Sequence, residues 1–111
     1  MAKPAYRLTR LAEADYTEIL RFTRRRWGKE QLQAYRRLLN EGIEAVAHEP
    51  VRLNSNARGE LRAGFRSFHI GLLAARPSLG RHVIFYRVAS DDVVEILRIL
   101  HERMEASSHL P

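Results

Sequence analysis

Apolar residues recur at helical spacing through the first half of the chain, and this pattern predicts two helices. The first is expected to begin at Thr9 or Arg10, to end near residue 27, and to stop at Gly28. The second is expected over residues 29–48, because Pro50 ends it. Residues 6–9 are short and alternating, and are predicted to form an edge strand before the first helix. Two amphipathic helices joined at one glycine form a helical hairpin.

The second half of the chain has the period of two that is typical of strands. Residues 50–59 are polar and predict a loop, after which alternation around Gly64 predicts a strand over residues 61–70 with a bulge or bend at that glycine. Residues 74–80 are expected to be a connecting loop. Two strands are predicted at residues 82–88 and 93–100, joined by a turn.

The last predicted strand is apolar on both faces apart from Glu95 and Arg98, so it is expected inside the sheet. Residues 104–111 are expected to be a polar tail with one helical turn. Neither layer can bury its apolar side alone, so the helices should cover one face of the sheet. For 111 residues one core suffices. The sequence therefore predicts one α+β domain over residues 1–111, with an N-terminal strand, an α-helical hairpin packed on an antiparallel β-sheet, and a short C-terminal tail.

Charge adds a candidate partner to this picture. The chain has 19 Lys and Arg against 13 Asp and Glu, a net charge of +6, and all but two of the basic residues are arginine. The guanidinium group matches carboxylates and phosphates, which favours an acidic protein or nucleic acid as the partner. A bias of the genome toward arginine codons is the alternative explanation.

Several classes of chemistry find no support in the residue types. The chain has no cysteine, no glycine-rich phosphate loop, no zinc spacing and no Ser-His-Asp order, and its histidines are dispersed. We therefore expect no cofactor, no metal and no catalytic residue. Because no apolar run approaches the roughly 20 residues of a membrane span and no signal-peptide core is visible, we expect a cytoplasmic protein without a membrane partner.

Basic residues on or near the predicted strands make up the main candidate binding surface. If they share the face away from the helices, they would form a basic surface for phosphates or carboxylates; a solvated sheet face is the alternative. The set is Arg62, Arg66, Arg81, Arg87, Arg98 and Arg103, with His69, His82 and His101.

Two further groups of side chains lie on the predicted helices. Arg24, Arg25 and Arg26 at the end of the first helix complement its dipole, with binding of an anionic partner as the alternative. Aromatic residues at periodic positions are expected in the core, with an exposed groove as the alternative. They are Phe22, Trp27, Tyr35 and Phe65.

The carboxy-terminal half resembles a known family. Residues 81–88 (RHVIFYRV), then residues 95–105 after a short acidic turn, and then His109-Leu110, are similar to the carboxy-terminal signature of ParE-type toxins of the ParE/RelE superfamily. The resemblance covers nearly the whole chain, because the helical half also matches at Leu8-Thr9, Ala12, Asp15, Ile19, Trp27-Gly28, Gln31 and Tyr35. The chain departs from the family pattern in residues 71–80, which lengthen a hairpin, and at Glu105, where aspartate is usual.

The resemblance implies the toxin of a type II toxin-antitoxin pair. Such a toxin forms a hetero-oligomer with a ParD-like antitoxin, whose disordered carboxy-terminal segment folds along the toxin surface. ParE-type toxins act on DNA gyrase and block replication without catalysis of their own, whereas the related RelE branch is a ribosome-dependent mRNA endonuclease. Fold alone does not separate the two branches, and a toxin that has lost its toxicity is a third alternative.

The resemblance also directs the choice of site residues. As contacts to gyrase we expect Arg98, His101, Arg103 and Met104, supported by Arg62, Arg66 and Arg81. In the endonuclease alternative the same residues would hold a phosphate while His82 or His101 transfers a proton. An acidic, amphipathic antitoxin segment would occupy a groove formed with the helical hairpin, for which the candidates are Tyr16, Phe22 and Tyr35, although the core is the favoured place for each.

Overall fold

The two helices form where local sequence signals place them. The structure, a computed structural model, describes residues 5–111. Helix α1 (Arg10–Trp27) is capped by Thr9, whose Oγ1 accepts the Ala12 N–H at 3.1 Å and donates to the Leu97 carbonyl at 2.8 Å. Helix α2 (Lys29–His48) begins after Gly28, whose φ of 91° suits glycine. The predicted helical hairpin is therefore confirmed.

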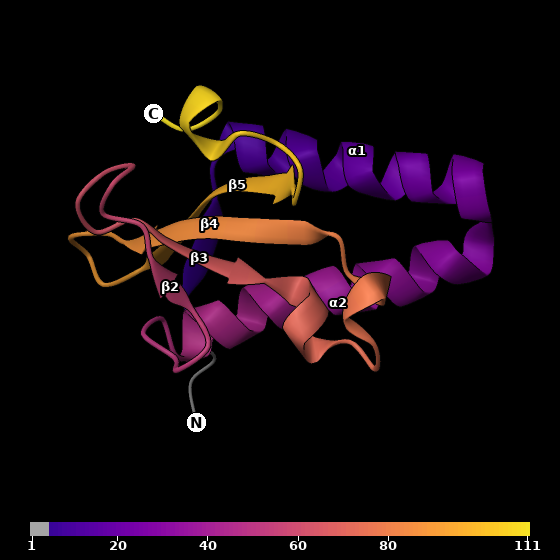
Figure 1. The fold of residues 1–111 in the computed structure, drawn as a ribbon, viewed down its shortest axis with the longest axis horizontal. Helices are drawn as coiled ribbons and strands as arrows, with labels where there is room; N and C mark the ends of the chain where they lie inside the picture. Colours follow the sequence, from indigo (N-terminus) through magenta and orange to yellow (C-terminus); the bar gives the residue numbers. More distant parts are fainter. Residues whose placement is uncertain (1–4) are drawn as a thin grey trace.

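The hairpin packs on one face of a five-stranded sheet (Figure 1). The strands are β1 (Tyr6–Leu8), β2 (Asn56–Ala57), β3 (Arg66–His69), β4 (His82–Val88) and β5 (Val94–His101), in the spatial order β1-β5-β4-β3-β2. β1 lies at the edge and pairs with β5 in parallel, while the other neighbours are antiparallel. The α+β fold class, the edge strand and the interior position of the last strand are confirmed, but the sheet is mixed and not antiparallel throughout, because β1 pairs in parallel with β5.

The strand predicted over residues 61–70 is wrong for its first half. Only Arg66–His69 forms a strand, and Gly64 lies in a turn with a φ of 85° instead of at a bulge. The irregularity of the sheet lies elsewhere, between Phe85 and Tyr86, where the register on β5 skips Leu97. Strand β2 falls in the predicted polar loop.

Short β2 is held by a side chain and has little strand propensity of its own. The Arg66 guanidinium donates to the Pro50 carbonyl at 3.1 Å and to Ser55 Oγ at 2.7 Å, which fixes the loop beside β3. Residues 70–80 contain two 3₁₀ turns, η1 (Ile70–Leu73) and η2 (Pro77–Leu79), and the tail contains a third, η3 (Ala106–Ser108). The predicted connecting loop and the helical turn of the tail are confirmed.

The main core lies between the hairpin and the sheet. Its largest fully buried side chains are Tyr86, Phe68, Leu39, Ile70, Ile84, Ile96 and Val46, and each such side chain contributes about 1.5–3 kcal/mol on burial. A second, smaller cluster covers the far face, where Phe85, Leu100 and Ala106 pack with Leu110 of the tail. None of the helices in the described part of the chain is long and apolar enough to cross a membrane.

Candidate functional site: a pocket at the tip of the helical hairpin

The helical hairpin is longer than the sheet it covers. At 1.5 Å per residue the helices span roughly 27 to 30 Å, whereas a strand of the length of β4 spans roughly 23 Å. The tip of the hairpin therefore extends past the end of the sheet (Figure 1). Phe22 and Trp27 are 55% and 61% exposed there, so the prediction that they belong to the core is wrong. Phe65 is buried as predicted, and Tyr35 is half-buried.

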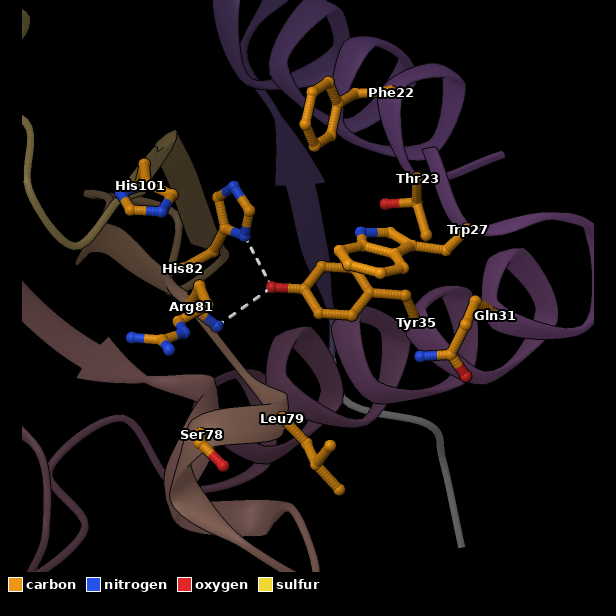
Figure 2. Close-up of a pocket in the computed structure, with 10 residues that line it drawn as sticks. All are labelled: Phe22, Thr23, Trp27, Gln31, Tyr35, Ser78, Leu79, Arg81, His82 and His101. Carbon is orange, nitrogen blue, oxygen red and sulfur yellow. Dashed lines mark hydrogen bonds between the residues drawn. The ribbon is translucent and has the colours of Figure 1, made fainter. Parts of the chain in front are cut away.

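A pocket of about 350 Å³ lies between this tip and the end of the sheet. We call it the hairpin pocket. Figure 2 shows that its side chains converge from α1, α2, η2, β4 and β5. The lining residues are Phe22, Thr23, Trp27, Gln31, Tyr35, Ser78, Leu79, Arg81, His82 and His101.

Tyr35 connects the helical wall of the pocket to the sheet. Its hydroxyl oxygen accepts the Arg81 backbone N–H at 3.0 Å, and its O–H is hydrogen-bonded to Nδ1 of His82 (Figure 2). Burial raises the pKa of the Tyr35 hydroxyl, so the group keeps its proton. With this O–H as the hydrogen-bond donor, His82 accepts at Nδ1 and carries its own proton on Nε2.

His82 is held in the neutral form. Burial lowers its pKa from the ordinary 6.5 to about 4, and the neighbouring His101 acts in the same direction. The two rings face each other across paired positions of β4 and β5, with centroids 5.5 Å apart in an edge-to-face arrangement. His101 is only partly buried, and its Nδ1 accepts the Arg103 N–H at 3.2 Å. The sheet side of the pocket therefore presents two imidazole rings, of which that of His82 is uncharged.

Glu102 fixes the end of the sheet beside the pocket. Its carboxylate accepts from His69 Nε2 and from the Arg81 guanidinium, both at 2.8 Å, and these hydrogen bonds lower the pKa of the Glu102 carboxyl to about 2. His69 Nδ1 in turn accepts the Gly71 N–H at 3.0 Å. The ends of β3, β4 and β5 are thus tied together through one carboxylate, which also neutralises part of the Arg81 charge.

The residues predicted to contact the target do not form one group. Arg81 and His101 line the hairpin pocket, and Arg103 and Met104 are exposed just after β5. Arg66 is the first residue of β3, and Arg62 lies in the turn before it. Both are therefore at the opposite end of β3 from His69.

Arg98 is used inside the fold. Its Nε and Nη2 donate to the two carboxylate oxygens of Asp15 at 2.7 and 2.9 Å, and both side chains are only 15% exposed. The same carboxylate accepts the Ile99 N–H at 3.0 Å, which satisfies the edge of β5 beyond the last residue of β1. A third donor of Arg98, Nη1, bonds to the His109 carbonyl at 3.0 Å and holds the tail. All three nitrogen atoms of the guanidinium group therefore donate hydrogen bonds within the fold.

The expected basic surface on the far face of the sheet does not form. Alternation places Val83, Phe85 and Leu100 on that face, and the tail covers them. Arg87, which shares this face, is paired with Glu95 at 2.9 Å. The sequence shows how many arginines lie on or near the strands. It does not show that apolar residues occupy the same face of the sheet between them.

The residues predicted to contact an antitoxin are split in the same way. Phe22 and Tyr35 lie together in the hairpin pocket. Tyr16 instead packs against the main core and bonds through its hydroxyl to Asn40 Oδ1 at 2.7 Å, which joins α1 to α2.

Sequence reasoning missed the pocket itself. The sequence pattern predicts Trp27 in the core, and it gives no indication that Gln31, Ser78 and Leu79 belong to one site. One feature of the sequence does indicate an exposed tip. Strands of about seven residues cannot cover a predicted helix of about 18 residues along its whole length. No group of three or more His, Asp or Glu side chains within residues 5–111 is arranged to hold a metal ion.

The fold and the pocket together define the class, an α+β protein with a helical hairpin packed on one face of a mixed five-stranded sheet. Residues 6–106 match the family described as the ParE toxin of the type II toxin-antitoxin system parDE. The chain is 41% identical over 105 residues to Toxin ParE1 of Caulobacter vibrioides, covering 95% of this chain and 96% of that protein. It is 34% identical over 105 residues to Toxin ParE1 of Mycobacterium tuberculosis, with the same coverage, and 33% identical over 108 residues to Toxin ParE of Escherichia coli, covering 96% and 92%. The chain therefore belongs to the ParE toxin family and is the toxin component of a type II toxin-antitoxin system.

Proposed function

We propose that this toxin inhibits DNA gyrase by binding, without catalysing a reaction of its own, and that a ParD-like antitoxin neutralises it in the cytoplasm. The observation that carries the proposal is the family match over residues 6–106. The target contacts that the structure leaves accessible lie at the end of β5, where Arg103 and Met104 are exposed beside Arg81 and His101. Arg62 is accessible too, but Arg66 and Arg98 act through the structure, since their guanidinium groups hold the β2 loop and the tail.

The test is a gyrase supercoiling assay with the antitoxin-free chain. We expect inhibition, accumulation of cleaved DNA, and reversal by the cognate antitoxin. Arg103→Ala should weaken inhibition by about tenfold, the loss that corresponds to about 1.4 kcal/mol of binding. Arg10→Ala removes another exposed charge, at the first residue of α1, and should leave inhibition unchanged. A folded, growth-arresting chain without effect on gyrase would refute the proposal.

For the antitoxin we propose an acidic, amphipathic segment that places an apolar side chain in the hairpin pocket. Phe22 and Tyr35 offer apolar surface there, and Arg81 supplies a cation at the rim. Phe22→Ala should weaken antitoxin binding, measured by calorimetry. Leu53→Ala is the matched control, because Leu53 is a fully exposed apolar residue in the loop before β2. Equal affinities for both variants would show that the antitoxin binds elsewhere.

The endonuclease alternative has one observation in its favour, which is that His82 and His101 lie together in the pocket beside Arg81. Two features oppose it. A pKa of about 4 means that His82 is not the imidazolium acid near neutral pH, and its Nδ1 is already hydrogen-bonded to the Tyr35 hydroxyl. Ribosome-dependent cleavage in a primer-extension assay, abolished by His101→Gln, would establish this alternative in place of gyrase inhibition.

A further inference from the structure

The tip of the helical hairpin carries several cations, most of which form no ion pair within the described part of the chain. Arg24, Arg25, Arg26 and Lys29 are all exposed within six residues of chain. Glu18 pairs with Arg21 at 3.2 Å and with Arg25 at 3.9 Å. Within residues 5–111, no carboxylate lies within 4.0 Å of the other three cations. The tip therefore keeps an uncompensated positive charge.

Helix stability explains only part of this charge. Arginines in the last turn of α1 complement the negative end of its dipole. Lys29, however, is the first residue of α2, where a positive charge opposes the dipole. A cation is thus present on both sides of Gly28, although the second helix gains nothing from it.

The same tip exposes large aromatic rings. Trp27 is 61% exposed and Phe22, on the preceding turns of α1, is 55% exposed. The Arg26 guanidinium lies over the Trp27 ring, 4.7 Å from its centre, so the cation stacks on one face of the indole. Two exposed aromatic rings beside these cations make a surface that is both aromatic and positively charged.

We propose that this tip binds single-stranded nucleic acid, with a base stacked on Trp27 and the phosphates held by Arg24, Arg26 and Lys29. Single-stranded nucleic acid is the ligand that supplies both a flat π surface and a repeating anion. A duplex keeps its bases stacked within the helix and would meet only the cations. An acidic peptide can pair with the cations, but its carboxylates are not attached to flat bases that stack on an indole. This binding requires no gyrase and does not depend on the function proposed above.

Trp27 is the sole tryptophan of the chain, so its fluorescence reports directly on the tip. The full chain is titrated with oligodeoxyuridylate and, separately, with oligouridylate, which differ only in the sugar. Quenching by either oligonucleotide is the expected result, and a difference between the two shows which sugar is preferred. A duplex of the same length should quench far less.

Salt dependence tests the role of the cations. Each phosphate contact contributes a slope of about −0.7 to log K against log salt for a single strand. Arg24→Gln/Arg26→Gln should therefore make the slope shallower by about 1.4, measured by anisotropy of a labelled oligonucleotide. Arg10→Gln/Arg37→Gln removes the same charge from exposed positions outside the tip and should retain the original slope.

Three results would overturn the proposal. They are the absence of quenching by both oligonucleotides, equal quenching by the duplex, and equal loss of slope in the tip and control variants. Quenching by polyglutamate without any by the oligonucleotides would assign the tip to an acidic protein segment. Because the titration contains no gyrase, its failure and a failure in the supercoiling assay remain distinguishable.

Discussion

The Asp15–Arg98 pair allows a quantitative prediction for Asp15→Asn. The substitution removes the charge that meets the bidentate guanidinium at 2.7 and 2.9 Å. Neutralising one member of a buried ion pair costs about 3–5 kcal/mol, because the other charge is left without a partner. Both side chains keep 15% exposure, and asparagine can still accept the Ile99 N–H. We therefore expect a loss of about 2–3 kcal/mol in the free energy of unfolding.

Urea denaturation followed by circular dichroism measures this loss, and a thermal scan should show a decrease in Tm of about 4 °C per kcal/mol. Glu18→Gln is the matched control on the same helix. Its carboxylate pairs with Arg21 and Arg25 while all three side chains are more than half exposed, so we expect a change within about 0.5 kcal/mol.

The double variant Asp15→Asn/Arg98→Met tests the reasoning itself. Replacing both members of a buried pair leaves no unpaired charge, so the double variant should be more stable than the sum of the two single losses predicts. Simple additivity, or a loss for Asp15→Asn no larger than that for Glu18→Gln, would refute the claim that this pair holds α1 to β5.

Three further predictions concern protonation and packing. His82 should titrate near pH 4 by NMR. Because the unfolded chain binds this proton from pH 6.5 downward, the free energy of unfolding should fall between pH 6.5 and 4, by at most about 3 kcal/mol. The variant His82→Gln should not show this fall. The Glu102 carboxyl, with its pKa lowered to about 2, stabilises the fold above its ordinary 4.5, so this contribution should disappear as the pH falls from 4.5 toward 2 and should be missing in Glu102→Gln under acid denaturation. Gly42→Ala should cost about 1–3 kcal/mol in urea denaturation despite the better helix propensity of alanine, because its Cβ would lie 2.9 Å from buried methyl groups of Ile70 and Ile84, whereas Gly59→Ala meets nothing within 4 Å and should be neutral.

The sequence was sufficient for elements that local signals define. Thr9 and Gly28 mark the ends of α1 by capping and by a positive φ, and both act within a few residues. β4 and β5 were recognisable because β-branched and aromatic residues dominate them. β2 could not be found in this way, since its pairing depends on the Arg66 side chain reaching Pro50 and Ser55.

The site was predicted less well, because exposure at the hairpin tip depends on what lies opposite each helix. The apolar stripe of α1 passes through both Phe22 and Thr23, and periodicity does not choose between them. The structure buries Thr23, whose hydroxyl bonds to the Ile19 carbonyl at 2.7 Å, and leaves Phe22 open. Only the relative lengths of helix and strand decide that the sheet ends before the tip.

The arginines show why a charge count alone could not locate the binding surface. The guanidinium groups of Arg66 and Arg98 donate hydrogen bonds to carbonyl, hydroxyl and carboxylate groups within the fold. Alanine at either position would release a loop or the tail, so a loss of toxicity there would report unfolding as readily as a lost contact. Arg103 is exposed, and its side chain makes no hydrogen bond or ion pair with other side chains or carbonyls of residues 5–111. Toxicity lost in Arg103→Ala, with unchanged Tm, would therefore be attributable to the target surface, whereas the same loss in Arg98→Ala would not.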